Sequence, residues 1–193
     1  MKANLRREMI ARRDALSGAE RASLAQALAE QLARLPQYTK ARSVLATMSI
    51  GSEWNTRVFL ERAMADGKVV VLPRISAPPR KLELYGVADL SSDLIPGTWD
   101  IPEPDPARCG RLDLAEVDFA LVPALAIDAG RHRLGYGAGY FDKLLAGRGA
   151  HPFCVTALPA AFVVESLPHE SHDIPVDLVV NEHGPVTHQE KAR

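Results

Sequence analysis

Apolar residues near the start of the chain recur at the spacing of an α-helix. Ser17, followed three residues later by Glu20, forms a capping-box pattern that is typical of a helix start. Leucines then return at intervals of four, four and three residues on one helix face, until Pro36 ends the helix. These leucines are Leu24, Leu28, Leu32 and Leu35. A shorter basic helix is expected before Ser17, so residues 1–35 are predicted to form two helices.

Beyond residue 43 the pattern changes to short, almost continuous apolar runs, which are typical of strands buried on both faces. Such runs lie at 44–48, 69–72, 119–123, 153–156 and 177–180, and a more alternating run at 81–87 predicts an edge strand. Asn55 or Thr56 can begin an intervening helix, and Gly67 fits its C-terminal cap. Residues 89–112, rich in Pro, Gly, Asp and Ser, are predicted to form an ordered loop, and the chain from His188 is expected to fray.

Strands that alternate with helices indicate a largely parallel sheet with helices on both faces, which is a three-layer α/β architecture. The length of 193 residues fits one domain or two small ones, and 47% hydrophobic and 24% charged residues are ordinary for a globular protein. The net charge of −1 gives no electrostatic basis for nucleic acid or an anionic membrane as the main partner. Two cysteines without a CxxC pair, and a charged N-terminus without the apolar core of a signal peptide, favour the cytoplasm.

A glycine-rich segment, residues 128–142, carries the clearest chemistry. Three glycines alternate within five positions, and because glycine permits φ > 0, successive N–H groups can turn toward one anion. Arg133 can offer a bidentate fork to phosphate, and Asp142 can hold Mg²⁺ against phosphate oxygens. The spacing alone fits a tight turn as well as a phosphate loop, since it is neither the dinucleotide GxGxxG pattern nor the P-loop. The flanking Arg and Asp favour the phosphate loop, with a helix from about Tyr140. The glycines are Gly135, Gly137 and Gly139.

The ten residues from Arg133 to Asp142 resemble the signature of the 5-formyltetrahydrofolate cyclo-ligase family, also called methenyltetrahydrofolate synthetase. The family pattern is Arg-Leu-Gly-x-Gly-x-Gly-Tyr-Tyr/Phe-Asp, preceded by an apolar strand, a proline, and an Asp with a nearby Gly. Those preceding residues are here Pro123, Asp128 and Gly130. The resemblance extends over nearly the whole chain. Further matching blocks are Lys2 to Arg6, Glu53 to Thr56, Leu72 to Arg74, Ile101 to Pro104 and His172 to Asp177.

This resemblance implies the NagB/RpiA/CoA transferase-like fold and a monomer that acts on a reduced folate with ATP and Mg²⁺. The implied reaction converts 5-formyltetrahydrofolate and ATP into 5,10-methenyltetrahydrofolate, ADP and phosphate through an iminium phosphate. Arg133 and Tyr140 are the implied catalytic residues, and Asp142 with Asp177 the implied metal ligands. The implied ATP-binding residues are Lys2, Arg6, Arg133, Leu134, Gly135, Tyr136, Gly137, Ala138, Gly139, Tyr140 and Phe141. The implied folate-binding residues are Met48, Glu53, Trp99, Tyr136, Gly137, Ala138, Gly139 and Tyr140.

Three positions depart from the family pattern and leave the contacts to the folate tail open. Trp99 stands where Phe or Gly is frequent, Ala138 where some members have Lys, and Tyr136 where Arg or Lys is frequent. Trp54 is a further candidate for an apolar wall of the folate pocket. For Met48, Trp54 and Trp99, ordinary packing is an equally good interpretation.

Three other functions compete with the cyclo-ligase hypothesis. The first is an enzyme of similar fold that holds a sugar phosphate and needs no ATP. The second is a folate-binding protein without catalysis. The third is a family relative that uses ATP in another pathway, such as thiamin metabolism. Oxygen ligands leave Mg²⁺ and Mn²⁺ both open.

Other residues have an ordinary interpretation. The Arg12–Arg13 pair is expected to be solvated, Cys109 to be a loop thiol and Cys154 to lie in a strand core, and His132 receives no role. The absence of HxxxH or HExxH spacing argues against a zinc site among His151, His169, His183 and His188.

Overall fold

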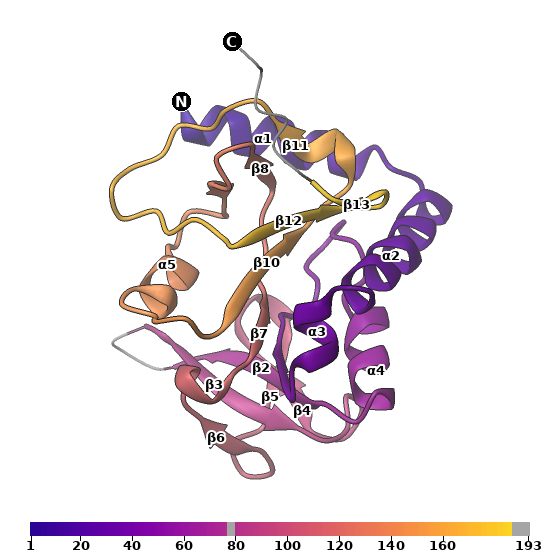
Figure 1. Cartoon of the computed structure of the whole chain (residues 1–193), viewed down its shortest axis with the longest axis vertical. Helices are drawn as coiled ribbons and strands as arrows, with labels where there is room; N and C mark the ends of the chain where they lie inside the picture. The colour runs from indigo at the N-terminus through magenta and orange to yellow at the C-terminus, as the bar shows by residue number, and fades with distance from the viewer. Residues whose placement is uncertain (77–79, 187–193) are drawn as a thin grey trace.

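The computed structural model describes residues 1–76 and 80–186, and its centre is one eight-stranded sheet. Its strands are β1 (Ser43–Leu45), β2 (Val69–Ile75), β3 (Leu82–Val87), β6 (Gly110–Leu112), β7 (Phe119–Leu121), β10 (Phe153–Ala157), β12 (Leu178–Asn181) and β13 (Gly184–Pro185). Their order is β13-β12-β10-β7-β1-β2-β3-β6. The strands from β12 to β2 pair in parallel, whereas β13, β3 and β6 pair antiparallel at the two ends. The predicted α/β class with a largely parallel sheet is confirmed (Figure 1).

Both faces of this sheet are covered, as the continuous apolar runs predict. One face carries α2 (Gly18–Ala33), α3 (Pro36–Lys40) and α4 (Arg57–Ala65). The other carries α1 (Lys2–Asp14), α5 (Tyr140–Leu145) and a small sheet of β11 (Val163–Val164), β8 (Ala126–Asp128) and β9 (Arg133–Leu134). Within β1, Val44 packs in the core of the first face and Leu45 in the core of the second. Alternate side chains thus enter opposite cores, and the one polar residue of β1, Ser43, is buried with its hydroxyl donating to Glu116 O at 2.8 Å.

The helix start predicted at Ser17 is confirmed as a complete capping box. Ser17 Oγ accepts a hydrogen bond from Glu20 N at 3.2 Å, and Ser17 N donates to Glu20 Oε2 at 2.8 Å. The first bond gives a partner to the N–H group of Glu20, which has none within the helix. Ser17 Oγ also donates to Glu20 Oε2 at 2.6 Å, and this bond, together with that from Ser17 N, holds the pKa of Glu20 below its usual value.

Replacing Ser17 by alanine is expected to lower the free energy of unfolding by about 1 kcal/mol, because one capped N–H group loses its partner. Urea denaturation followed by circular dichroism measures this change. Ser23→Ala, within α2 and away from its start, is the control and should leave the midpoint nearly unchanged. Equal midpoints for Ser17→Ala and wild type would show that the capping box contributes nothing to stability.

The predicted stop of α2 before Pro36 is confirmed, since α2 ends at Ala33, and Pro36 also begins the short helix α3, where its missing N–H costs nothing at the first helical position. Two expectations about strands are wrong. Strand β2 does not end at Pro73 but continues to Ile75. β1 pairs only with its first three residues, so Pro73 needs to donate no hydrogen bond to β1. Strand β3 is not an edge strand, since β6 pairs with it along the other side.

The segment 89–112 is also more ordered than a loop. It contains β4 (Leu94–Pro96) and β5 (Pro102–Pro104), which form an antiparallel pair, and then β6. A turn with Trp99 and Asp100 at φ values of 57° and 58° joins β4 to β5. β4 and β5 form a local pair, whereas β6 depends on β3 outside the segment, and Pro and Gly content alone predicts neither arrangement. The expected fraying from His188 lies outside the described residues.

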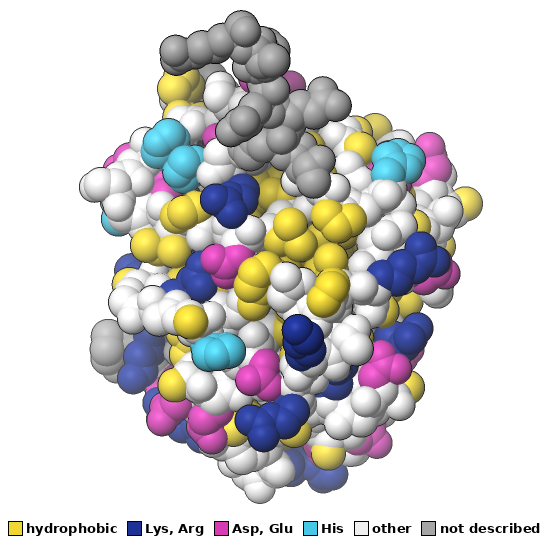
Figure 2. Space-filling view, viewed as in Figure 1, with side chains coloured by type: hydrophobic (Ala, Val, Ile, Leu, Met, Phe, Trp, Pro, Cys, Tyr) yellow, Lys and Arg dark blue, Asp and Glu magenta, His cyan; other side chains and the backbone are white. Residues whose placement is uncertain are grey.

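The outside of the molecule mixes charges of both signs. Figure 2 shows Lys and Arg side chains interspersed with Asp and Glu on one face, around an area of hydrophobic side chains in the region of β10 and β12. Within residues 1–76 and 80–186, no helix combines the length and the apolar character needed to span a bilayer. Cys154 lies in β10 as predicted, and its complete burial raises the pKa of its thiol to about 11.

Candidate functional site

A cavity of about 670 Å³ opens where the central parallel strands β1, β2 and β7 end. In α/β proteins, ligands bind outside the carboxyl ends of parallel strands. The glycine segment between β9 and α5 lines the cavity, together with the first residues of α1 and part of the connection between β11 and β12. The side chains and loop residues contributed by these elements include Lys2, Arg6, Met48, Glu53, Trp99, residues 133–142, Glu170, His172 and Asp173.

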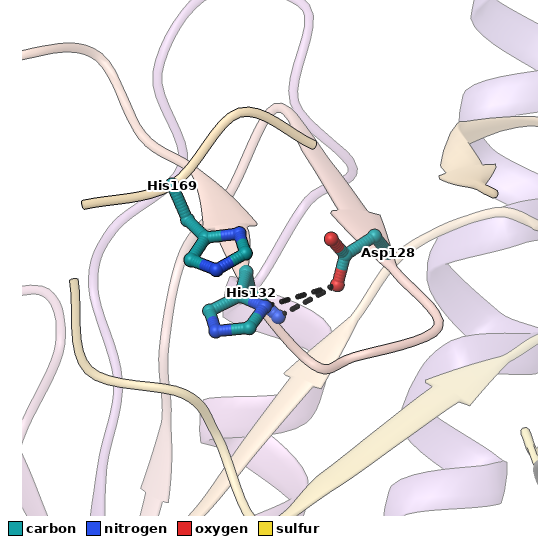
Figure 3. Close-up of side chains that lie close together, drawn as sticks. All are labelled: Asp128, His132 and His169. Atoms are coloured by element: carbon teal, nitrogen blue, oxygen red, sulfur yellow. Dashed lines mark hydrogen bonds and ion pairs between the residues drawn. The ribbon is translucent and has the colours of Figure 1, made fainter. Parts of the chain in front are cut away.

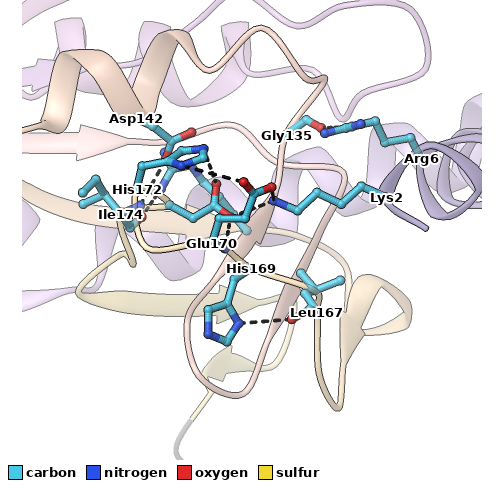
Figure 4. Close-up of polar contacts among 11 residues, drawn as sticks. Lys2, Arg6, Gly135, Asp142, Leu167, His169, Glu170, His172 and Ile174 are labelled. Carbon is cyan, nitrogen blue, oxygen red and sulfur yellow. Dashed lines mark hydrogen bonds and ion pairs between the residues drawn. The ribbon is translucent and has the colours of Figure 1, made fainter.

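The glycine loop adopts the conformation that its sequence predicts at two of its three glycines. Gly137 and Gly139 have φ values of 106° and 64°, in the left-handed region that side chains disfavour. Gly137 also makes room for Arg6, since a Cβ atom there would lie 3.3 Å from Arg6 Cζ. Arg6 Nε in turn donates a 2.7 Å hydrogen bond to Gly135 O (Figure 4). The loop and the N-terminal helix are thus held together at the cavity.

Arg133 and Asp142 form an enclosed ion pair across the two ends of this loop. Arg133 Nη2 lies 2.6 Å from Asp142 Oδ1, and the side chain of Arg133 is only 5% exposed. Arg133 Nη1 donates to Ile174 O, and Ile174 N donates to Asp142 Oδ1 at 3.1 Å. Burial lowers the pKa of Arg133, while the negative charge of Asp142 acts in the opposite direction. The pair therefore fixes the loop to the chain segment around Ile174.

That segment brings two further carboxylates to the cavity. Lys2 Nζ lies 2.8 Å from Asp173 Oδ2 and 3.2 Å from Glu170 Oε1, and Figure 4 shows Lys2 reaching from α1 toward this segment. Burial alone would raise the pKa of Asp173, but the hydrogen bonds from Lys2 and from Glu170 N outweigh it and hold the pKa below its usual value. Asp173 is therefore a carboxylate that stays ionised beside the glycine loop.

Glu53 is surrounded by donors at another part of the cavity wall. Its Oε2 accepts from Ile50 N at 2.8 Å, and its Oε1 accepts from the hydroxyl of Tyr136. Arg13 Nη1 donates to the same hydroxyl at 2.7 Å and lies 3.5 Å from Glu53 Oε1. Burial raises the pKa of Tyr136 and the charge of Glu53 raises it further, so its hydroxyl remains a donor. The expectation that Arg13 is solvated is wrong, because its side chain is only 11% exposed.

Every residue that the sequence assigns to ATP or folate lines this cavity, whereas one assigned metal ligand does not. Asp177 accepts hydrogen bonds from Arg148 Nη2 at 2.9 Å and from Cys154 N at 2.7 Å, and it lines a separate cavity. Asp177 thus ties β10 to the start of β12 and is not brought to Asp142. The carboxylate found near Asp142 is Asp173, which precedes Ile174.

One more assignment changes with the fold. Trp54 does not line the cavity: its Nε1 donates to Ala157 O at 3.0 Å, and its ring packs in the core. Glu170 and Arg13, in or beside the cavity, received no role from the sequence, and Glu103 was noted only as part of the block Ile101 to Pro104. Asp173 belongs to a block that the resemblance identified, but the spacing of two Asp residues within that block gave no means of choosing between them.

Comparison with known proteins identifies the family to which this chain belongs. The model of the 5-formyltetrahydrofolate cyclo-ligase family matches residues 1–182. The chain belongs to this family. A 5-formyltetrahydrofolate cyclo-ligase of Mycolicibacterium smegmatis is 30% identical over 175 residues, which cover 90% of this chain and 89% of the relative. One from Mus musculus is 26% identical over 194 residues, or 96% of each chain.

A solved structure extends the cyclo-ligase similarity to the fold. The NMR structure of 5,10-methenyltetrahydrofolate synthetase from Aquifex aeolicus matches with a TM-score of 0.83 and 28% identity. The match covers 100% of this chain and 99% of the other. The resemblance of the sequence to the cyclo-ligase family is therefore confirmed, and the cavity described above belongs to a protein with a cyclo-ligase fold.

Proposed function

We propose that this cyclo-ligase family member closes 5-formyltetrahydrofolate to 5,10-methenyltetrahydrofolate with ATP and Mg²⁺, releasing ADP and phosphate. The observation that carries the proposal is the convergence of two different recognition surfaces on one cavity. Arginines and a glycine loop suited to phosphate line one part of it, and Glu53 lies in another. A sugar-phosphate enzyme would need the first surface, but it would leave the second without a role.

The phosphate side of the cavity supports ATP as the phosphoryl donor. Phosphoryl transfer depends on positioning and on neutralising charge rather than on a protein nucleophile. Arg6 lies beside Gly137, where a Cβ atom would be 3.3 Å from Arg6 Cζ, and Lys2 reaches the cavity from the same helix. Their partners Gly135 O, Glu170 and Asp173 hold both cations at the cavity in the free protein.

The donor set beside these cations fits Mg²⁺. Asp142 and Asp173 present carboxylate oxygens, the ligands that hard divalent cations prefer, and both lie among the residues that line the cavity. We propose that these two residues hold the ion, in place of the Asp142 and Asp177 pair expected from the sequence. When bound, Mg²⁺ would offset negative charge on the ATP phosphates.

The folate side of the cavity supports a pterin as the acceptor. Within the described residues each carboxylate oxygen of Glu53 accepts one hydrogen bond, and Arg13 lies 3.5 Å from Oε1, which leaves lone pairs for the amino-pyrimidine edge of a pterin. Met48 and Trp99 supply apolar surface, and Trp99 is 64% exposed in the free protein. Tyr136, Ala138 and Tyr140 would line the space between Glu53 and the phosphate side.

The proposed chemistry follows from the poor leaving ability of a formamide oxygen. Transfer of the terminal phosphoryl group of ATP to that oxygen gives ADP and an iminium phosphate. The neighbouring folate nitrogen then attacks the formyl carbon, loses its proton, and expels phosphate as the ring closes. Arg133 and Tyr140, which both line the cavity, are the proposed catalytic contacts, since positioned donors stabilise charge that develops during such steps.

The test follows the absorbance of methenyltetrahydrofolate after the protein is mixed with 5-formyltetrahydrofolate and Mg²⁺, with and without ATP. Product that forms only with ATP is the expected result. Folate binding without product would favour a binding protein, and ATP hydrolysis without product would favour a relative from another pathway.

A NagB/RpiA/CoA transferase-like fold label, a monomeric state and a cytoplasmic location remain predictions.

The two aspartates of the block 172–177 offer a matched test of the metal site. Asp173→Asn should raise the Mg²⁺ concentration needed for half-maximal activity by roughly 10- to 100-fold, because an ionised oxygen ligand is lost. Asp177→Asn loses its contacts with Arg148 and Cys154 N and should lower thermal stability, but it should leave the Mg²⁺ requirement unchanged. A larger effect of Asp177→Asn on the Mg²⁺ requirement would return the ligand role to Asp177.

A further inference from the structure

Two histidines and an aspartate that are far apart in sequence meet beside the turn between β8 and β9. Asp128 ends β8, His132 precedes β9, and His169 lies in the connection between β11 and β12. The two imidazole rings stack with centroids 3.8 Å apart and planes 2° from parallel (Figure 3). Each residue can offer one ligand atom, and these three atoms all lie within 4.8 Å of one another. None of the three residues lines the cavity assigned to ATP and folate.

The carboxylate of Asp128 is held in position by the backbone. Asp128 is buried, with Oδ1 accepting from His132 N at 2.9 Å and Oδ2 accepting from Leu167 N at 2.9 Å. Gly130 leaves room for this arrangement, because a Cβ atom there would lie 3.0 Å from His132 Nδ1 and 3.3 Å from Asp128 Oδ1. Each carboxylate oxygen keeps a further lone pair, so these bonds orient Asp128 without using up its capacity as a ligand.

The distances are close to those of a metal centre. Two ligands bound to one tetrahedral Zn²⁺ lie roughly 3.3 Å apart, given metal–ligand bonds of about 2.0–2.1 Å. His132 Nδ1 and Asp128 Oδ1 are 3.6 Å apart. The in-plane lone pairs of two stacked rings run parallel, so the His169 ring must rotate to share an ion with His132. His169 is exposed, and its Nδ1 contacts only Leu167 O, at 3.3 Å, among the printed contacts of the described residues, so this rotation disturbs no packed core.

We propose that Asp128, His132 and His169 form a cation site for Zn²⁺, separate from the proposed Mg²⁺ site. Two imidazole nitrogens and one carboxylate oxygen suit Zn²⁺ and related transition ions better than Mg²⁺, which prefers oxygen alone. Three protein ligands leave a fourth position for water or another small ligand. The histidine spacing in the sequence argues against zinc only for ligands close together in the chain, and this set spans 42 positions from Asp128 to His169, both ends included.

The site would join the two chain segments that carry the charged groups of the cavity. His132 is followed by Arg133, and His169 is followed by Glu170, which contacts Lys2. An ion bound by His132 and His169 would therefore fasten the connection between β11 and β12 to the β8–β9 turn. Zn²⁺ at this site acts as a clamp on the wall of the cavity and makes no contact with the reacting groups.

The experiment first removes all metal from the protein and adds excess Mg²⁺ to occupy the carboxylate sites. It then titrates the protein with Zn²⁺ and measures bound zinc by equilibrium dialysis. The wild type should bind one Zn²⁺ per chain, and zinc at 100 times its dissociation constant should raise the midpoint of thermal unfolding by roughly 5–10 °C. Co²⁺ provides a second readout, since a tetrahedral site with nitrogen ligands gives visible absorption that Zn²⁺ abolishes.

His169→Asn and His132→Asn should each raise the dissociation constant for Zn²⁺ by roughly 100-fold. Loss of a ligand costs at least as much affinity as loss of a residue that hydrogen-bonds to a ligand. His169→Asn alters an exposed side chain, so its fold should be preserved. His183→Asn, at an exposed histidine in the β12–β13 turn, is the matched control and should bind as the wild type does. Equal zinc binding by the wild type and His169→Asn, or no zinc-dependent rise in the unfolding midpoint, would overturn the proposal. Neither readout depends on cyclo-ligase turnover.

Discussion

Replacing Arg133 by alanine is expected to lower the turnover number for ATP-dependent ring closure by roughly 10²–10³-fold, the typical cost of removing one preorganised donor. Arg133 is an enclosed cation, with 5% of its side chain exposed, against 25% for Lys2. In such a setting a guanidinium is poorly hydrated and can interact strongly with a developing negative charge. Initial rates of methenyltetrahydrofolate formation at saturating ATP and folate measure this loss.

The enclosed position of Arg133 also creates a risk that must be controlled. Its removal leaves Asp142 with Ile174 N as its remaining donor, and breaking a buried ion pair costs about 3–5 kcal/mol of stability. Arg148→Ala is a matched control, since Arg148 is 13% exposed and pairs with Asp177 at 2.9 Å in a separate cavity. It should lower the unfolding midpoint but leave turnover within a few-fold of wild type.

A second variant separates charge from geometry. Arg133→Lys keeps a positive charge and should restore stability in part, but it cannot reproduce contacts with both Ile174 O and Asp142. We expect its turnover to lie between those of the wild type and Arg133→Ala. Near-wild-type turnover in folded Arg133→Ala would remove Arg133 from the mechanism.

The parts of this site that sequence analysis predicted are those encoded within short segments. The alternating glycines, the arginine before them and the aspartate after them lie within ten residues, so their proximity does not depend on the rest of the fold. Lys2 and Glu53 could be assigned only through the family resemblance, because nothing local connects either residue to the loop. In the same way, Ser17 and Glu20 predicted a helix start correctly from a spacing of three residues.

The errors arise where distant segments decide the outcome. Asp173 and Asp177 are four residues apart, and the hydrogen bond from Ile174 N to Asp142 is what brings Asp173 to the cavity. Arg13 looked like a surface residue because its partners Glu53 and Tyr136 lie 40 and 123 positions further along the chain. The stacking of His132 on His169 could not be predicted either, because the two residues are far apart in the sequence.

Replacing Glu53 by glutamine is expected to raise the KM for 5-formyltetrahydrofolate, with little change in the KM for ATP. The substitution puts an NH₂ donor where the pterin edge also presents donors, and it removes the charge from bonds with Tyr136 and Ile50 N. Hydrogen bonds to a charged group are worth about 1.5–3 kcal/mol, so kcat/KM for the folate should fall roughly 10- to 100-fold. Steady-state kinetics with each substrate varied in turn measures both constants.

The contrast between the two substrates is what makes this result decisive. Glu61→Gln, which removes a carboxylate paired with Arg57 on the outer surface of α4, should leave both KM values unchanged. Because Glu53 also accepts from Tyr136, a general disturbance of the glycine loop would raise the KM for ATP as well. A rise confined to the folate identifies Glu53 as the pterin contact, whereas parallel rises would mean that Glu53 acts by positioning Tyr136 and the loop.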